Sequence, residues 1–253
     1  MIALIGSGPV RTGLDRAQVL DAAVALVDEA GLSSLTMRRL GRELGVEAMA
    51  LYRYVPSRED LLNGVVERVI DELYADPEVH LLPEQSWQEY LIRLANGVRR
   101  IALTHPQVFP LVATRPPAAP WMQPPLRSLR WVESLLTGLL SQGFSKQDAV
   151  YAYRAFSSFL LGHLLLEVGA LGVDTSVVDE PVAGPIDPYQ PDIDTAPLND
   201  YPLLVELAPQ LADYHFAEEF ADSLHNLLDR LGPGAAGEQH DASTTTAANV
   251  WRM

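Results

Sequence analysis

The sequence predicts an all-α protein with two domains. The first observation is that apolar residues recur with the three- and four-residue spacing of amphipathic helices from about residue 15 to residue 231. The second is that most of these segments begin at a capping residue or end at glycine or proline. The third is that no segment shows sustained alternation of apolar and polar residues, as a β-strand would. A chain of 253 residues is long enough to bury a sizeable core.

The first element expected is a supporting helix over residues 15–30. Asp15 can cap it with Gln18 at the third helical position, and Gly31 ends it. The preceding residues 1–14 lack the cationic start and the long apolar middle of a signal peptide. We expect them to form a flexible arm.

The segment from Thr36 to Arg58 predicts two short helices joined by a tight turn, a helix-turn-helix unit. Thr36 is a good N-cap, and Gly45 suits the left-handed position that ends a helix. The segment carries five arginines and two glutamates, in a chain with a formal net charge of −15. Such a cationic island on an acidic protein indicates contact with phosphates. A solvated pair of helices with arginines for solubility has the same charge pattern.

A long helix is expected over residues 58–74, and Pro77 ends it. The stretch that follows, as far as Gln85, contains proline and glutamate and is expected to be the domain boundary. The helix-turn-helix domain, with this linking helix, therefore covers residues 15–75.

The second domain is expected over residues 76–231. Ser86 and Glu89 form a capping box that opens its first helix, and proline ends that helix after Thr104. A short helix to Val112 follows. The remaining helices are expected over residues 126–142, 146–169, 202–211 and 214–231.

Two segments of this domain have special composition. Residues 146–169 are apolar nearly all round, so that helix must be buried on several sides. Residues 172–200 are rich in proline, aspartate and valine and have no helical rhythm, so a long mobile loop is expected. Residues 232–253 are expected to be a disordered tail.

Composition and motifs argue against several classes of protein. There is no cysteine, so neither disulfides nor thiolate chemistry is available. No apolar run reaches the roughly 20 residues that span a bilayer. There is no Gly-x-Ser-x-Gly elbow and no phosphate-binding glycine loop. We therefore expect no enzyme.

One face of the expected helix over residues 214–231 carries several acidic residues and two histidines. A metal site in a helix bundle needs matching acids on a facing helix, and the apolar helix offers only Glu167. A solvated or dimer-rim face is the better interpretation, and neither a metal nor a cofactor is expected. The residues of this face are His215, Glu218, Glu219, Asp222 and His225.

The arginine-rich segment combines apolar, glycine and aromatic residues in one defined pattern that extends over more than twenty residues. These are Leu35-Thr36-x-Arg38-Arg39-Leu40, Leu44-Gly45-Val46 and Leu51-Tyr52-x-Tyr54-Val55, with Arg58-Glu59-Asp60-Leu61-Leu62 after them. In this pattern the segment closely resembles the DNA-binding domain of the TetR family of bacterial transcriptional repressors. The resemblance implies DNA contacts by Thr36, Met37, Arg38, Ala48, Met49, Ala50, Tyr52, Arg53, Tyr54 and Arg58.

These residues are expected to contact DNA in different ways. Arg38 is the best candidate for a base contact, because guanidinium can pair with guanine through two hydrogen bonds. Ala48, Met49 and Ala50 bring only small or apolar groups, so thymine methyls are their expected partners. Phosphates are expected to be held by Thr36, Tyr52, Tyr54 and Arg58.

The second domain carries four further motifs in order: Ser86-Trp87-Gln88-Glu89-x-Leu91, Thr114-Arg115-Pro116, Gln142-Gly143-Phe144-Ser145 and Phe159-x-x-Gly162. In these it resembles the ligand-binding domain of the tetracycline repressor subgroup, so the resemblance covers roughly residues 14–231. It implies a homodimer in which the helices around 146–169 and 214–231 pack against their copies as a four-helix bundle. It also implies a ligand pocket.

The polar residues of that pocket are largely replaced here. Leu111 stands where the subgroup has a magnesium-binding histidine, and Ser158 stands where it has a second histidine. Leu94 and Leu135 replace an asparagine and a glutamine. A hard cation prefers oxygen ligands, so neither magnesium nor tetracycline is expected.

The expected pocket is mostly apolar and aromatic, with Tyr74 and His163 as polar handles. Such a lining suits a bulky, largely apolar ligand, although the same side chains can simply form a core. Its residues are Tyr74, Leu94, Val98, Leu111, Val112, Thr114, Arg115, Trp131, Leu135, Phe156, Phe159 and His163.

The resulting hypothesis is a cytoplasmic, dimeric, ligand-responsive transcriptional repressor. It is expected to bind a palindromic operator in double-stranded DNA and to be released by a bulky, mostly apolar small molecule, such as an antibiotic or another natural product. One alternative is a small-molecule-sequestering protein with a vestigial DNA-binding head. Another is an all-α enzyme that uses the acidic face of the last helix.

Overall fold

The computed structural model of the protein describes residues 14–80, 86–115, 129–173 and 201–234. Within these ranges the regular structure consists of ten α-helices and two short 3₁₀ helices, which confirms the all-α prediction. The expected arm before Leu14, nearly all of the expected loop over 172–200 and the tail after residue 234 lie outside the described residues.

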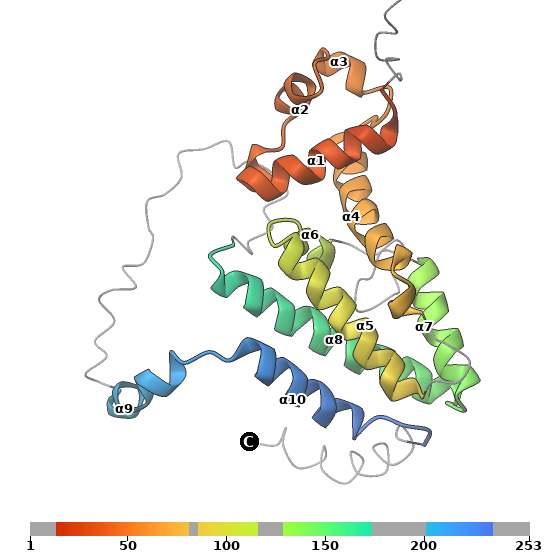
Figure 1. Ribbon diagram of the computed structural model, residues 1–253, viewed down its shortest axis with the longest axis vertical. Coiled ribbons are helices and arrows are strands. Elements are labelled where there is room, and N and C mark those ends of the chain that lie inside the picture. The colour runs from red at the N-terminus through yellow and green to blue at the C-terminus, as the bar shows by residue number, and fades with distance from the viewer. Residues whose placement is uncertain (1–13, 81–85, 116–128, 174–200, 235–253) are drawn as a thin grey trace, which may run out of the picture.

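The N-terminal helices form a unit at one end of the molecule, which we call the head (Figure 1). It contains α1 (Arg16–Ala30), the 3₁₀ turn η1 (Leu32–Ser34), α2 (Met37–Glu43) and α3 (Ala48–Leu51). Both halves of the expected capping box at Asp15 are formed. The helix α3 is only four residues long and continues as a turn, which makes it shorter than the sequence rhythm indicates.

The helix α4 (Arg58–Ala75) leads from the head into the rest of the molecule (Figure 1). Its N-cap is Ser57, whose hydroxyl accepts a hydrogen bond from the backbone N–H of Asp60. Along one side it buries a stripe of leucine and valine. A 3₁₀ turn, η2 (Pro77–Val79), follows directly.

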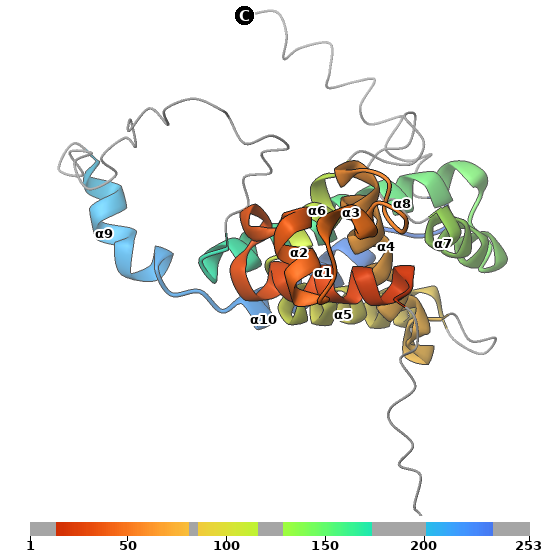
Figure 2. The same cartoon turned by 90° about the horizontal axis from the view of Figure 1, so that it is seen from above.

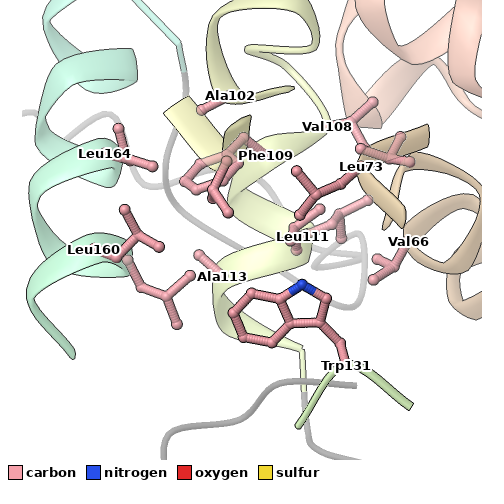
Figure 3. Packing of buried hydrophobic residues seen from close by; sticks show 14 of the residues in the cluster. Val66, Leu73, Ala102, Val108, Phe109, Leu111, Ala113, Trp131, Leu160 and Leu164 are labelled. Atoms are coloured by element: carbon pink, nitrogen blue, oxygen red, sulfur yellow. The ribbon is translucent and has the colours of Figure 1, made fainter. Parts of the chain in front are cut away.

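The larger unit, which we call the body, is built from α5 (Trp87–Thr104), α6 (Phe109–Thr114), α7 (Leu129–Ser141), α8 (Lys146–Ala170) and α10 (Phe216–Leu228). Trp131 of α7, Leu111 of α6 and Leu160 of α8 converge on one cluster in its core (Figure 3). The helix α10 lies along α8, where the rings of Phe159 and Phe220 stack at 5.8 Å.

The helix α8 is long and apolar enough, by length and composition alone, to cross a membrane. This differs from the sequence-based expectation that no apolar segment is long enough to span a bilayer. In the structure α8 packs against α5, α6, α7 and α10. Its apolar composition therefore matches its position as the central helix of a packed body.

The helix α9 (Pro202–Leu211) lies away from the body in both views (Figures 1 and 2). None of its residues is buried. Its exposed apolar side chains are Leu203, Leu204, Val205, Leu207 and Leu211.

Candidate nucleic-acid interface and ligand cavity

The two short helices of the head approach each other very closely at Gly41. A β-carbon at this position would lie 2.8 Å from the backbone oxygen of Val46, closer than such atoms can come. The backbone N–H of Val46 in turn donates to the oxygen of Gly41 at 2.9 Å. Gly45 takes a φ of 66° in the connecting turn, the left-handed conformation expected for it. The angle between α2 and α3 is therefore set by two glycines.

The residues predicted to contact DNA lie on α2, on α3 and at their ends. Met49 is 76% exposed, which is unusual for a methionine in a small apolar segment. Thr36 caps α2, and its hydroxyl accepts from the N–H of Arg39 at 3.2 Å. The exposed members are Thr36, Arg38, Met49, Tyr52, Arg53 and Arg58, and the half-buried ones are Met37, Ala48, Ala50 and Tyr54.

Arg58 has a role inside the head as well. Its Nη1 donates a hydrogen bond of 2.8 Å to the backbone oxygen of Leu35. Leu35 directly precedes Thr36, the cap of α2, and Arg58 is the first residue of α4. This contact therefore ties the start of the linking helix to the start of the helix-turn-helix unit.

A small cavity lies in the body between five helices. Its volume is about 40 Å³. Ser157 is one of the lining residues, and its buried hydroxyl has no hydrogen-bond partner among the described residues. The surface that the cavity presents is apolar, so this hydroxyl lies behind it. The lining consists of Ile70 and Leu73 of α4, Val98 of α5, Val112 of α6, Trp131 of α7, and Ser157, Leu160 and Leu161 of α8.

Three of the predicted ligand residues meet in this cavity: Val98, Val112 and Trp131. Four others are completely or almost completely buried in the surrounding core, namely Leu94, Leu111, Leu135 and Phe156.

Three predicted residues make contacts outside the cavity lining. Tyr74 lies beneath the guanidinium of Arg130, 4.4 Å from the ring centre. Phe159 and His163 contact Phe220 of α10, with ring centres 5.8 and 5.2 Å apart.

The remaining two lie at the end of α6. The hydroxyl of Thr114 donates to the backbone oxygen of Pro110 at 2.7 Å. Arg115 is 1% exposed and turns toward α4, where its Nε donates to Asn63 at 3.0 Å and its Nη2 contacts the carboxylate of Glu59. Arg115 therefore joins the end of α6 to the first turns of α4.

Sequence reasoning left five lining residues out of the predicted site: Ile70, Leu73, Ser157, Leu160 and Leu161. Ile70 and Leu73 recur at the spacing of the inward face of α4, but periodicity cannot tell a core residue from one that lines a cavity. The helix α8 is apolar nearly all round, so its pattern marks no single face. The available signal was Ser157, a small polar residue within a strongly apolar helix.

The acidic face of α10 is exposed to solvent. Within the described ranges no three histidine, aspartate or glutamate side chains lie close enough together to hold a metal ion.

Two family models match the chain. The model of bacterial regulatory proteins of the tetR family matches residues 19–65. The model of the tetracyclin repressor-like C-terminal domain matches residues 81–232. The two matches leave residues 66–80 between them, which form the rest of α4 and the turn η2.

Individual relatives agree with these matches. An HTH-type transcriptional regulator of Saccharopolyspora erythraea is 30% identical over 154 residues, covering 61% of each chain. The class D tetracycline repressor protein of Escherichia coli is 33% identical over 155 residues, covering 60% of this chain and 66% of that protein. The chain thus spans slightly less than two thirds of these curated relatives.

Solved structures extend the similarity. A possible TetR family transcriptional regulator from Streptomyces coelicolor is 31% identical, with a TM-score of 0.64, covering 85% of this chain and 97% of that one. A TetR variant from Acinetobacter baumannii in complex with minocycline is 26% identical, with a TM-score of 0.53, covering 64% and 86%.

Proposed function

Because the chain belongs to the TetR family of bacterial regulatory proteins, we propose that it is a dimeric transcriptional repressor that a small molecule releases from its operator. The observation that carries the proposal is the path of α4. One end of this helix is tied to the helix-turn-helix unit through Arg58, and its other half supplies Ile70 and Leu73 to the cavity. A ligand in the cavity therefore touches the helix that holds the head.

In the proposed complex the turn containing α3 enters the major groove. Arg38 reads a guanine, and Met49 and the alanines on either side of it contact thymine methyls. Phosphates are held by the other exposed residues that were predicted to contact DNA, together with Tyr54. These exposed residues are Thr36, Tyr52, Arg53 and Arg58, and Met37 lies at the same surface. The exposure of Arg38 and Met49 supports this assignment.

We propose that two copies form the active species, so that the operator is a near-palindrome. The dimer is supported by apolar side chains that are exposed to solvent in a single copy. Leu166 on α8 is 74% exposed, and the apolar residues of α9 are exposed along the whole helix. Such surfaces mark contact sites more often than free solvent faces. Acting on chromosomal DNA places the protein in the cytoplasm.

The proposed ligand is largely apolar, because the surface of the cavity is apolar. It forms a hydrogen bond with Ser157 once the lining helices have moved apart and uncovered the buried hydroxyl. An unpaired buried hydroxyl costs about 1–3 kcal/mol, which a matching group on a ligand recovers. The minocycline complex of the A. baumannii relative supports a small-molecule ligand. Leu111 offers no metal ligand at the position where the subgroup has histidine, so the proposed ligand binds without magnesium.

Ligand size gives the proposed mechanism. A drug-sized molecule needs roughly 300 Å³ or more, whereas the volume of the cavity is about 40 Å³. A bulky ligand must therefore push the lining helices apart, and α4 is one of them. Binding shifts the population toward an arrangement in which the two heads no longer match successive grooves, and the size of the effect equals the ligand's differential affinity for the two arrangements.

The test has two stages. First, the full chain selects duplexes from a random-sequence pool, and a near-palindromic consensus is expected. Second, release of that duplex is screened against bulky natural products and antibiotics. Failure to select any sequence contradicts the repressor. A compound that binds tightly without changing operator affinity contradicts the release mechanism, and binding of compounds without any DNA binding would favour a sequestering protein.

A further inference from the structure

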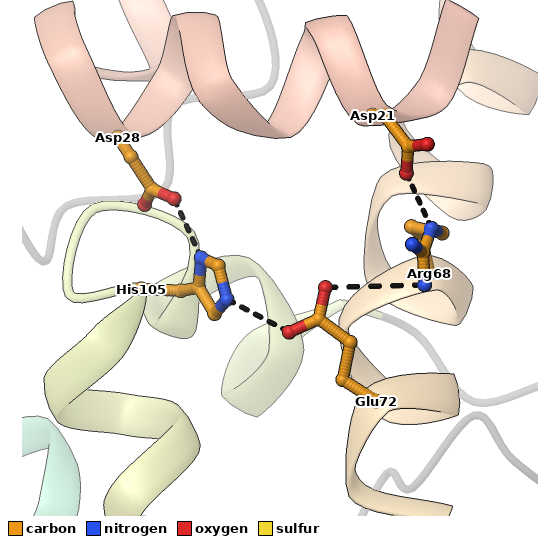
Figure 4. A network of polar contacts seen from close by, with 5 residues as sticks. All are labelled: Asp21, Asp28, Arg68, Glu72 and His105. Atoms are coloured by element: carbon orange, nitrogen blue, oxygen red, sulfur yellow. Dashed lines mark hydrogen bonds and ion pairs between the residues drawn. The ribbon is translucent and has the colours of Figure 1, made fainter. Parts of the chain in front are cut away.

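His105 lies where the head, the linking helix and the body meet (Figure 4). It caps the end of α5, and its backbone oxygen accepts from the N–H groups of Val108 and Phe109 at the start of α6. The ring is therefore held in place by the corner between these two helices. Only 13% of the side chain is exposed.

Each ring nitrogen of His105 contacts a carboxylate of a different helix. Nδ1 lies 2.6 Å from Oδ2 of Asp28 on α1, and Nε2 lies 3.1 Å from Oε2 of Glu72 on α4. A neutral imidazole carries one N–H, so it can donate to only one carboxylate. The protonated ring donates to both. The arrangement in Figure 4 therefore fits the imidazolium form.

The surrounding charges favour the same form. From α1 the ring faces Asp28, with Asp21 further along that helix, and from α4 it faces Glu72, with Arg68 one turn earlier. Arg68 is engaged by Asp21 at 2.5 Å and lies 3.9 Å from Glu72. Arg68 thus pairs with two of the three carboxylates, Asp21 and Glu72, and a protonated His105 supplies a second positive charge next to Asp28 and Glu72.

Burial of His105 opposes its positive charge, but the hydrogen bonds to Asp28 and Glu72 outweigh this and raise the pKa of the imidazole above 6.5. Burial also raises the pKa of the Asp28 carboxyl, against the lowering effect of the histidine. The shift of His105 indicates that its ring holds a proton more firmly than a histidine in water would.

We propose that His105 is a positioning residue for operator binding, which in its protonated form pins α1 of the head and α4 to the body and so makes operator affinity depend on pH. This inference rests on the proposed repressor function. The pinned arrangement is the one with the small cavity of about 40 Å³, which has no room for a bulky ligand. By linkage, an arrangement that excludes the releasing ligand is the one that favours the operator.

The direction of the pH effect follows from the contacts. The pinned arrangement binds the proton more tightly than an arrangement in which His105 has left the carboxylates. Operator affinity is therefore complete below about pH 6.5, the ordinary pKa of histidine, and falls as the pH rises through the raised pKa of the pinned ring. The loss is about tenfold for each protomer and each unit by which the two pKa values differ.

The experiment measures the affinity of the full chain for a duplex that it has selected at pH 6.0, between pH 6.0 and pH 8.5 at constant salt. The wild type should lose affinity across this range, whereas His105→Gln should show a flat profile. His215→Gln is the matched control, because His215 is exposed at the start of α10 and should leave the wild-type profile unchanged. Sedimentation of each variant checks that it is folded.

A second measurement does not depend on His105→Gln being folded. The ring proton resonances of the wild type are followed by NMR over the same range, and His105 should titrate above pH 6.5, the ordinary pKa of histidine. Asp28→Asn should move both this titration and the affinity midpoint to lower pH. Operator affinity that does not vary with pH, or a His105 that titrates at or below pH 6.5, overturns the proposed role of His105. A chain that selects no duplex at any pH instead contradicts the repressor function itself.

Discussion

At the scale of single residues, two arginines of the head have different surroundings. Arg58 donates to the backbone of Leu35 and so supports the fold of the head. Arg38 is exposed and has no such hydrogen bond within the described residues. A side chain without a partner in the free protein can turn entirely to a base edge. The two arginines should therefore respond differently to substitution.

Arg38→Ala should weaken binding to the selected operator by about 1–3 kcal/mol and relax the preference for one base pair, because a two-point contact with guanine is lost. Stability should hardly change. The check is a binding series on operator and random duplexes. Arg58→Ala is the comparison, and it should weaken all sequences alike, flatten the salt dependence and lower the melting temperature. Equal losses on both duplexes for Arg38→Ala would remove its assigned role.

Ser157→Ala should separate ligand binding from stability. Removing a buried hydroxyl that has no partner should leave the free energy of unfolding unchanged or raise it by about 1 kcal/mol. Affinity for a releasing compound should fall by about tenfold, because the compound loses its hydrogen bond. Titration calorimetry and denaturant unfolding measure the two effects. Ser158→Ala, at an exposed neighbouring position, should change neither; an equal loss of ligand affinity there would contradict the placement of the site.

At the scale of elements, α2 and α3 depend on one close contact. Gly41→Ala places a methyl group 2.8 Å from the backbone oxygen of Val46. Backbone cannot move aside as a flexible side chain can, so α3 should shift and the unfolding free energy of the head should fall by about 1–3 kcal/mol. Operator affinity should fall with it. Thermal unfolding and binding measurements test this.

The control is Arg42→Ala, one position further along α2, where the side chain is exposed. Alanine is a better helix former there, so the unfolding free energy should stay within about 0.5 kcal/mol of the wild type. If Gly41→Ala behaved in the same way as this control, the close packing of the two helices would not be what sets their angle.

The helix α4 gains its importance from what its two halves contact. Near its start Glu59 and Asn63 meet Arg115 from the end of α6. Near its end Glu72 meets His105, and Leu73 lines the cavity. Any rearrangement of the cavity walls must therefore be transmitted to α4 or be absorbed by breaking these contacts.

At the scale of the whole molecule, the exposed apolar helix α9 points to a second copy. Replacing both Leu204 and Leu207 by Glu should leave the fold of one copy intact, because these side chains are exposed in it. It should shift the protein from dimer to monomer in sedimentation velocity and weaken operator binding, since a single head gains no support from the second half-site.

Gln210→Glu serves as the control, because it adds charge to the same helix at an exposed polar position. It should sediment as the wild type does. A double leucine variant that remains dimeric and binds operator normally would show that α9 takes no part in the dimer.

The sequence alone accounts for most of the local structure. The capping residues Asp15, Thr36 and Ser86 all cap helices as expected, because a cap depends on a few neighbouring residues. Gly45 has the expected positive φ for the same reason. The family resemblance of the helix-turn-helix unit was also readable, since its pattern lies within one continuous stretch of chain.

The partners of side chains from distant segments could not be read in this way. The pattern around Arg115 indicated a ligand residue, but its guanidinium meets Glu59 and Asn63, which lie more than fifty residues earlier. In the sequence His105 stands directly before Pro106 at the end of a helical pattern, and nothing near it reveals that the fold brings Asp28 and Glu72 to its two nitrogens. The spacing of apolar residues along the chain tells which face of a helix lies inside the protein. Which of the inward side chains fill the core and which leave a cavity is decided only by the packing of five helices against one another.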